Sequence, residues 1–177
     1  MTGLTDKEFL AMFLGRYQRA LAKIAALEQR EREIKSGAVS LHGVDVAADK
    51  VKAGKKTDGI MKSVVSVISI GEQIADLRQK LPALRKNTAL VIDKLPFTFQ
   101  GGLVLEVHFI DGYPLTSACS VLGISRAQVY SLYNKSLAML LNLPEVRELL
   151  ERYADRLREN KRRRMEKSRD SGEDPRE

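Results

Sequence analysis

Residues 115–140 read LTSACSVLGISRAQVYSLYNKSLAML. Their spacing is that of a helix-turn-helix, in which two helices cross closely and a tight turn joins them. Cys119 supplies a small side chain at the crossing, Gly123 a residue for the turn, and Val129 a branched side chain that fills the gap between the helices. Further aliphatic side chains complete the predicted core: Ala118, Leu122, Ile124, Leu132 and Leu137.

Residues that start, cap or end helices set the bounds of three predicted helices around this stretch. Pro114 opens a short helix over 115–122, and Ser125 is a good N-cap for a longer helix that ends near Asn142. A preceding helix over 97–110 stops at Asp111-Gly112, because Gly readily adopts the left-handed conformation at a helix end. We therefore expect one module over residues 96–143.

Residues 1–95 ahead of this module carry two long apolar stripes. Thr5 and Glu8 form a capping box, and apolar residues then recur at three- and four-residue steps, which predicts a helix to about Lys35. Residues 36–58 lose the pattern and are predicted to be a loop. A second helix follows, and its two heptad rows continue past Pro82 without losing register, which favours one kinked helix. Together they predict an antiparallel helical hairpin.

The hairpin also suits self-association. Surplus apolar surface on a long hairpin often pairs with a second copy, so we expect a homo-oligomer, and a dimer in particular. The same stripes fit a purely internal core equally well. The sequence leaves both interpretations open.

Positive charge is concentrated near the C-terminus. Residues 144–177 are predicted to form a helix from about Glu145, followed from about Ser168 by a charged, disordered end. Residues 156–169 hold eight basic residues against two acidic ones, whereas residues 96–144 are neutral. We expect this tail to grip phosphates non-specifically, since phosphate neutralisation supplies much of the affinity for DNA. A solvated helix end, where basic residues suit the helix dipole, is the alternative. The accessory contacts would come from Lys161, Arg162, Arg163 and Arg164.

Composition narrows the remaining classes of function. The chain has 177 residues, a net charge of +7, one Cys, two His and no Trp. A single Cys excludes an internal disulfide framework, and so few Cys and His argue against a zinc site, so we expect no metal and no cofactor. No apolar run approaches the roughly 20 residues of a membrane span. No catalytic constellation stands out, and we expect an all-α cytoplasmic protein that is not an enzyme.

Residues 103–140 resemble region four of bacterial sigma factors. The resemblance lies in Phe109-Ile110-Asp111-Gly112, Leu122-Gly123-Ile124-Ser125 and Ser136-Leu137. Ser117 stands where those modules carry Glu, and Cys119 where they carry Ala. About residues 7–140, as hairpin, loop and module, are similar in architecture to small phage-encoded late-transcription regulators of the RinA and ArpU type. The resemblance implies a regulator that acts in a bacterial host cell and contacts RNA polymerase.

The predicted recognition helix over 125–142 would enter the major groove of double-stranded DNA. Arg126 can donate two hydrogen bonds to guanine, and Gln128 can pair with adenine. Asn134 and Lys135, with the amides of Thr116 and Ser117, would contact phosphates. Resemblance to sigma modules places four residues at base-facing positions: Arg126, Ala127, Tyr130 and Ser131. The full predicted set is Thr116, Ser117, Ser125, Arg126, Ala127, Gln128, Tyr130, Ser131, Asn134 and Lys135.

Three functions remain after this reading. The first is a sequence-specific, sigma-like transcription regulator, probed by a footprint on its own promoters. The second is a small terminase subunit, which would bind DNA for packaging and form large rings. The third is an adaptor that contacts polymerase without DNA, because some helix-turn-helix modules bind protein.

Overall fold

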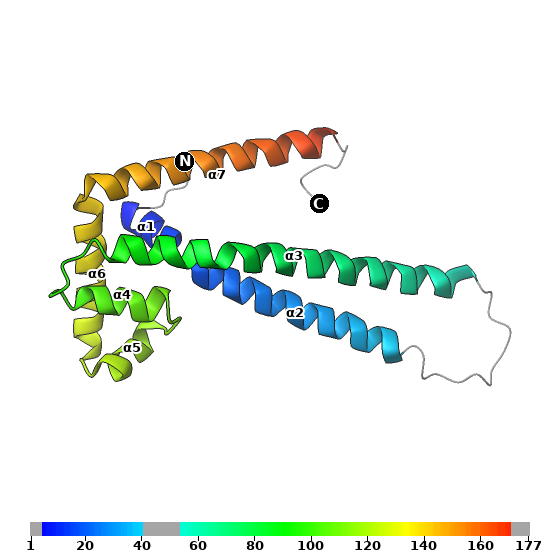
Figure 1. Cartoon of the computed structure of the whole chain (residues 1–177), viewed down its shortest axis with the longest axis horizontal. Coiled ribbons are helices and arrows are strands. Elements are labelled where there is room, and N and C mark those ends of the chain that lie inside the picture. Colours follow the sequence, from blue (N-terminus) through cyan, green and yellow to red (C-terminus); the bar gives the residue numbers. More distant parts are fainter. Residues whose placement is uncertain (1–4, 41–53, 171–177) are drawn as a thin grey trace. The chain divides into compact units, whose positions relative to one another are not determined.

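The computed structural model describes residues 5–40 and 54–170. These residues form seven α-helices and no strand, which confirms the predicted all-α class (Figure 1). None of the described helices is long and apolar enough to cross a membrane. The helices are α1 (Asp6–Leu14), α2 (Arg16–Ser40), α3 (Gly54–Ile92), α4 (Gly101–Phe109), α5 (Leu115–Leu122), α6 (Arg126–Asn142) and α7 (Pro144–Asp170).

The chain divides into two compact units. The small unit spans Arg16–Asn87 and contains α2 with most of α3. The large unit joins the residues up to Gly15 to those from Thr88 onward. The predicted domains 1–95, 96–143 and 144–177 differ from this division, because α1 and the last turn of α3 share a core with α4, α6 and α7.

The main core of the large unit draws on five helices. Thr88, which is fully buried on α3, donates a hydrogen bond from Oγ1 to the carbonyl oxygen of Leu14 at 3.2 Å. The bond satisfies a carbonyl at the end of α1 and ties α1 to α3. The buried members of this core are Leu10, Phe13, Leu14, Val91, Ile92, Leu95, Leu105, Phe109, Leu137, Leu140, Val146 and Leu150.

The first predicted helix is interrupted at Gly15. The capping box at its start is present, with Glu8 accepting from the Thr5 amide at 2.8 Å. A single helix from Thr5 to about Lys35 is nevertheless wrong, because α1 ends at Leu14 and α2 begins at Arg16. Gly is a weak helix former, and here its amide caps α1 by donating to the Ala11 carbonyl at 2.9 Å. α2 then continues to Ser40, beyond the predicted end.

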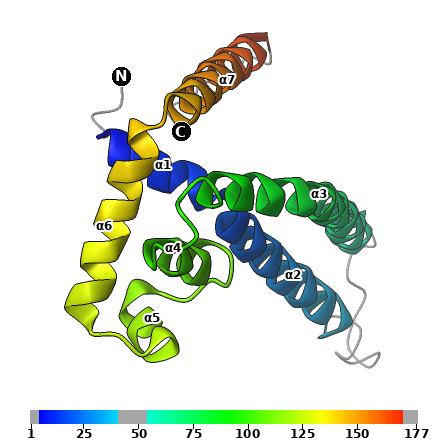
Figure 2. The same ribbon diagram turned by 60° about the vertical axis from the view of Figure 1, so that its left-hand side comes forward.

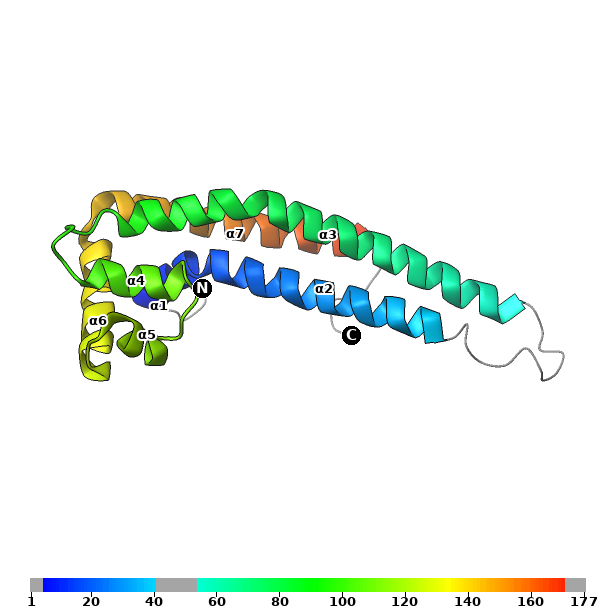
Figure 3. The same ribbon diagram turned by 60° about the horizontal axis from the view of Figure 1, so that its bottom comes forward.

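In the small unit, α2 and α3 run side by side in opposite directions (Figures 1 and 3). Ile24 of α2 is buried against Ile70 and Ile74 of α3. An ion pair between Arg78 and Glu28, at 2.7 Å, joins the same two helices. α3 continues through Pro82 as one helix.

The predicted loop over 36–58 is too long. Residues 36–40 belong to α2 and residues 54–58 to α3, while the rest of the loop lies outside the described residues. At the other end of the chain, α7 is helical to Asp170, so it includes the first three residues of the stretch predicted to be disordered.

The predicted start of the next helix at Phe97 is wrong, because α4 begins at Gly101. Phe97 is fully exposed in the connection after α3. A Cβ on Gly101 would lie 2.2 Å from Ser136 Oγ and 2.3 Å from the Phe99 ring. Glycine at this position therefore permits α4 to approach α6 closely.

Candidate nucleic-acid interface

The connection between α5 and α6 has the predicted local structure. Gly123 ends α5 with φ +66°, in the left-handed region. Ser125 caps α6, whose first helical residue is Arg126. The bounds of α5 and α6, and the positive φ of Gly112 after α4, match the sequence predictions. Figure 2 shows how α4 and α5 lie beside the N-terminal half of α6.

A small aliphatic core holds these three helices together. Val129, predicted to fill the gap between α5 and α6, is fully buried beside Val104 and Val107 of α4. The small residue that is fully buried on α5 is Ala118. Cys119, predicted at the crossing of α5 and α6, is partly buried and packs against this core, and its Sγ donates to the Thr116 carbonyl at 3.0 Å.

One face of α6 is open to solvent. Ala127, Tyr130, Ser131 and Asn134 recur at i, i+3, i+4 and i+7, so they lie on the side of the helix opposite the buried residues. Tyr130 is 40% exposed. The structure thus brings four of the predicted contact residues together on one surface, which we call the α6 face. All ten predicted contact residues of α5 and α6 are exposed.

Three of the ten residues are already engaged at the starts of α5 and α6, and one of them is Ser125, whose Oγ accepts a hydrogen bond from the Gln128 amide at 3.2 Å. Gln128 Oε1 accepts a hydrogen bond from the Ser125 amide at 2.9 Å, so its side chain caps α6 here. Oε1 keeps a second lone pair, and the two-pronged contact with adenine stays a prediction. The Ser117 amide donates to the Pro114 carbonyl at 2.8 Å. It is therefore not free to hold a phosphate, and the predicted contact of this amide is wrong.

Asn134 and Lys135 also have partners within the large unit. Asn134 Nδ2 donates to the Tyr130 carbonyl at 3.0 Å, which leaves Oδ1 and one N–H of its amide for another group. The Lys135 ammonium lies 5.5 Å from the centre of the Phe99 ring, within range of a cation–π interaction. This aromatic contact could not be predicted from the sequence, which places Phe99 within a helix over 97–110. In the structure α4 begins at Gly101, and Phe99 lies in the connection before it.

His108 is a structural residue that the sequence did not single out. It is partly buried, and its Nδ1 lies 2.9 Å from the Tyr113 carbonyl oxygen. Its ring also packs against those of Phe109 and Tyr133. Burial raises the pKa of Tyr133. These rings anchor the α4–α5 connection to α6.

The predicted accessory residues lie on α7. Arg162 pairs with Glu166 at 3.6 Å and Arg163 with Glu159 at 2.5 Å. Lys161 is exposed, and the side chain of Arg164 lies outside the described residues. Exposed pairs of this kind are worth little, so both arginines can exchange their partners for phosphates.

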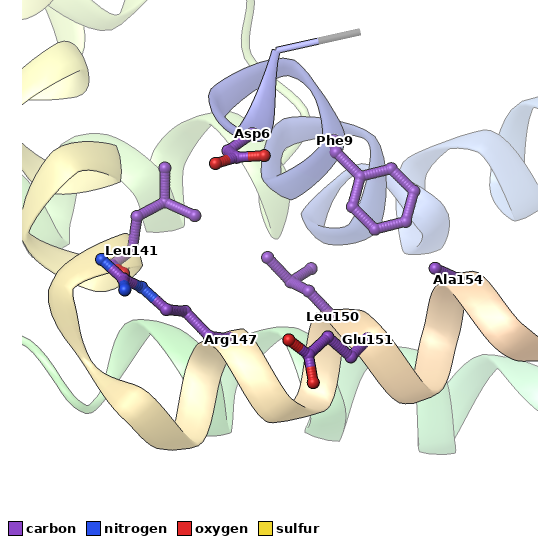
Figure 4. A pocket seen from close by; sticks show the side chains of 7 residues that line it. All are labelled: Asp6, Phe9, Leu141, Arg147, Leu150, Glu151 and Ala154. Carbon is purple, nitrogen blue, oxygen red and sulfur yellow. The ribbon is translucent and has the colours of Figure 1, made fainter. Parts of the chain in front are cut away.

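A pocket of about 350 Å³ lies between α1, α6 and α7 in the large unit (Figure 4). Asp6, Arg147 and Glu151 place charges of both signs around its apolar lining. Arg147 Nε donates to the Leu141 carbonyl at 2.5 Å, at the C-terminal end of α6. The pocket is therefore at the opposite end of α6 from Arg126. Within residues 5–40 and 54–170, no cluster of His, Cys, Asp and Glu could hold a metal ion.

Comparisons of the chain with protein-family models, with curated proteins and with solved structures found no match. The resemblance to sigma region four and to phage late-transcription regulators therefore stays a prediction from the residues quoted above.

Proposed function

We propose that the chain is a sequence-specific transcription regulator that binds double-stranded DNA with α6 in the major groove. The proposal rests above all on the α6 face, where exposed small and polar side chains stand on a packed support. The major groove admits a helix and presents a distinct pattern for each base pair. Asn134 retains an acceptor and a donor for adenine, and Tyr130 and Ser131 add hydroxyl groups beside it.

The polar groups around the α6 face have two roles in this proposal. One group fixes the direction of α6, and another contacts a base. Gln128 acts by capping α6 and so fixes the direction of the helix. Arg126, at the first turn, supplies the positive charge of this end and can donate to guanine. α5 ends at the left-handed Gly123 and α6 begins at Arg126, which is the element order of the helix-turn-helix that we propose.

Charge explains why a second element is needed. Residues 96–144 are neutral, and a neutral module binds DNA weakly because phosphate neutralisation supplies much of the affinity. In our proposal Lys161, Arg162 and Arg163 of α7 provide a non-specific grip. The resemblance adds a phage origin, action in the cytoplasm of a bacterial host and a contact with RNA polymerase.

Selection from random duplexes tests the proposal. The wild-type chain should enrich one motif, and Asn134→Ala should lose the preference at one base pair. Asn142→Ala is the matched control, because Asn142 is exposed at the other end of the same helix. Failure to enrich any motif at physiological salt, or equal effects of both variants, would contradict the proposal.

One observation favours a second candidate function, a protein-binding module. A pocket of about 260 Å³ beside the start of α4 is lined by Phe97, Phe99 and Leu103. Phe97 is fully exposed, and Asp93 and Glu106 give the lining a negative charge. An adaptor would use this pocket, and changes on the α6 face would then leave its binding intact.

A further inference from the structure

α3 carries exposed aliphatic side chains on the side that α2 does not cover. They recur at i, i+3, i+4 and i+7, so they form one stripe along the helix. The opposite side of the same segment packs through Ile70 against Ile24 of α2. The α3 stripe consists of Met61, Val64, Val65 and Ile68, which are 66%, 50%, 61% and 56% exposed.

Residues 61–70 are thus apolar on two opposite sides of one helix. A helix that is apolar all round is normally buried, and contiguous exposed apolar side chains mark interaction sites. α2 covers only one of the two sides. The stripe therefore needs a second apolar surface.

We infer that the α3 stripe of a second copy covers it, with the two α3 helices antiparallel about a two-fold axis. The charges beside the stripe favour this arrangement. Exposed Lys62 lies near the start of the stripe and exposed Glu72 one turn beyond its end. Antiparallel helices with Val65 opposite Ile68 place each Lys62 beside the Glu72 of the other copy. A parallel pair would bring like charges together, which destabilises an interface.

The size of the stripe sets the expected strength. Four half-exposed aliphatic side chains offer a few hundred Å², below the roughly 800 Å² per partner of a standard interface. The free protein should therefore be a weak dimer with a micromolar dissociation constant. Two adjacent half-sites on DNA would raise the effective concentration of the copies and complete the dimer. The inference rests on the proposed function and names the surface that joins its two copies.

Sedimentation equilibrium of the full chain tests the stripe. Wild-type protein should fit a monomer–dimer equilibrium, and Ile68→Asp should weaken it by about tenfold or more, since a charge would be buried at the contact. Leu90→Asp is the matched control, because Leu90 is 51% exposed on α3 outside the stripe. Helical circular dichroism should be equal in all three proteins. A monomer at every concentration, or an equal effect of both variants, would overturn the inference.

A charge exchange tests the orientation without touching the stripe. Lys62→Glu and Glu72→Lys should each weaken the dimer several-fold, because two like-charge contacts form per dimer. The double variant should recover the wild-type dissociation constant. Additive losses in the double variant would refute the antiparallel pair.

Selection on DNA separates the two proposals. If Ile68→Asp still enriches the wild-type half-site as a monomer, the stripe is the dimer contact and α6 the reader. A wild-type monomer that enriches a motif would overturn the dimer alone. A dimer that enriches nothing would support the stripe and contradict the proposed function.

Discussion

Ser125 and Gln128 cap the start of α6 by a reciprocal pair of hydrogen bonds. The Ser125 amide donates to Gln128 Oε1 at 2.9 Å, and the Gln128 amide donates to Ser125 Oγ at 3.2 Å. Both bonds satisfy amides that a helix start otherwise leaves without a partner. The proposed recognition helix is thus aligned by residues that sequence reasoning treats as DNA contacts.

Gln128→Ala should therefore act on stability more than on base preference. Loss of one arm of the cap should lower the free energy of unfolding by about 1 kcal/mol, measured by urea denaturation. Duplex selection should yield the same motif as wild type, with lower affinity throughout. A changed preference at a single base pair would instead make Gln128 a reader.

Gly101 and Gly102 form a matched pair of neighbours on α4. Gly101→Ala should destabilise the large unit by about 1–3 kcal/mol, because its Cβ would overlap Ser136 and Phe99. Gly102→Ala meets nothing within 4 Å and should stabilise α4 by up to about 1 kcal/mol through helix propensity. Chemical denaturation of both variants checks the prediction, and equal changes would refute the close approach of α4 to α6.

Glu8 should make a small, pH-dependent contribution to α1. Hydrogen bonds from the Thr5 amide, at 2.8 Å, and from its hydroxyl, at 2.9 Å, hold the pKa of Glu8 below its usual value. A lowered pKa stabilises the fold above the unfolded value of about 4.3, and this contribution is lost as the pH falls through the folded pKa. Wild type should exceed Glu8→Gln in stability at neutral pH. The difference in stability between the two proteins should vanish in acid. A difference that does not change with pH would contradict a cap that depends on the ionised Glu8 carboxylate.

Truncation after Asn160 tests the grip of α7. It removes Lys161, Arg162 and Arg163 but leaves the buried contacts of Val146 and Leu150 in place. The logarithm of affinity should depend less steeply on the logarithm of salt concentration, by roughly 0.9 for each lost phosphate contact. Base preference should not change. An unaltered salt dependence would mean that these residues do not contact phosphates and that this part of α7 is only a solvated helix end.

Local signals predicted local structure well. Asp111-Gly112, Gly123 and Ser125 act through backbone conformation and near-neighbour hydrogen bonds, so the bounds of α5 and α6 could be read from the sequence. Val129 could be placed in the core for a similar reason, since its spacing from Gly123 is set by the turn.

Features that depend on tertiary contacts could not be read in the same way. The break at Gly15 follows from the packing of α1 into the large unit. The apolar three- and four-residue spacing continues through this position, so it could not predict the break. Ala118 and Cys119 are adjacent and both small, so only the observed crossing of the helices tells which is buried. The α3 stripe was missed because the heptad rows describe only the opposite side of α3.

If α6 reads the major groove, methylation interference on the selected duplex will detect it. Guanine N7 lies in the major groove and adenine N3 in the minor groove, and dimethyl sulfate modifies both. Methylation at guanine N7 within the motif should block binding, whereas methylation at adenine N3 beneath α6 should not. Interference at adenine N3 alone, or at neither position, would contradict the reading of the major groove by α6.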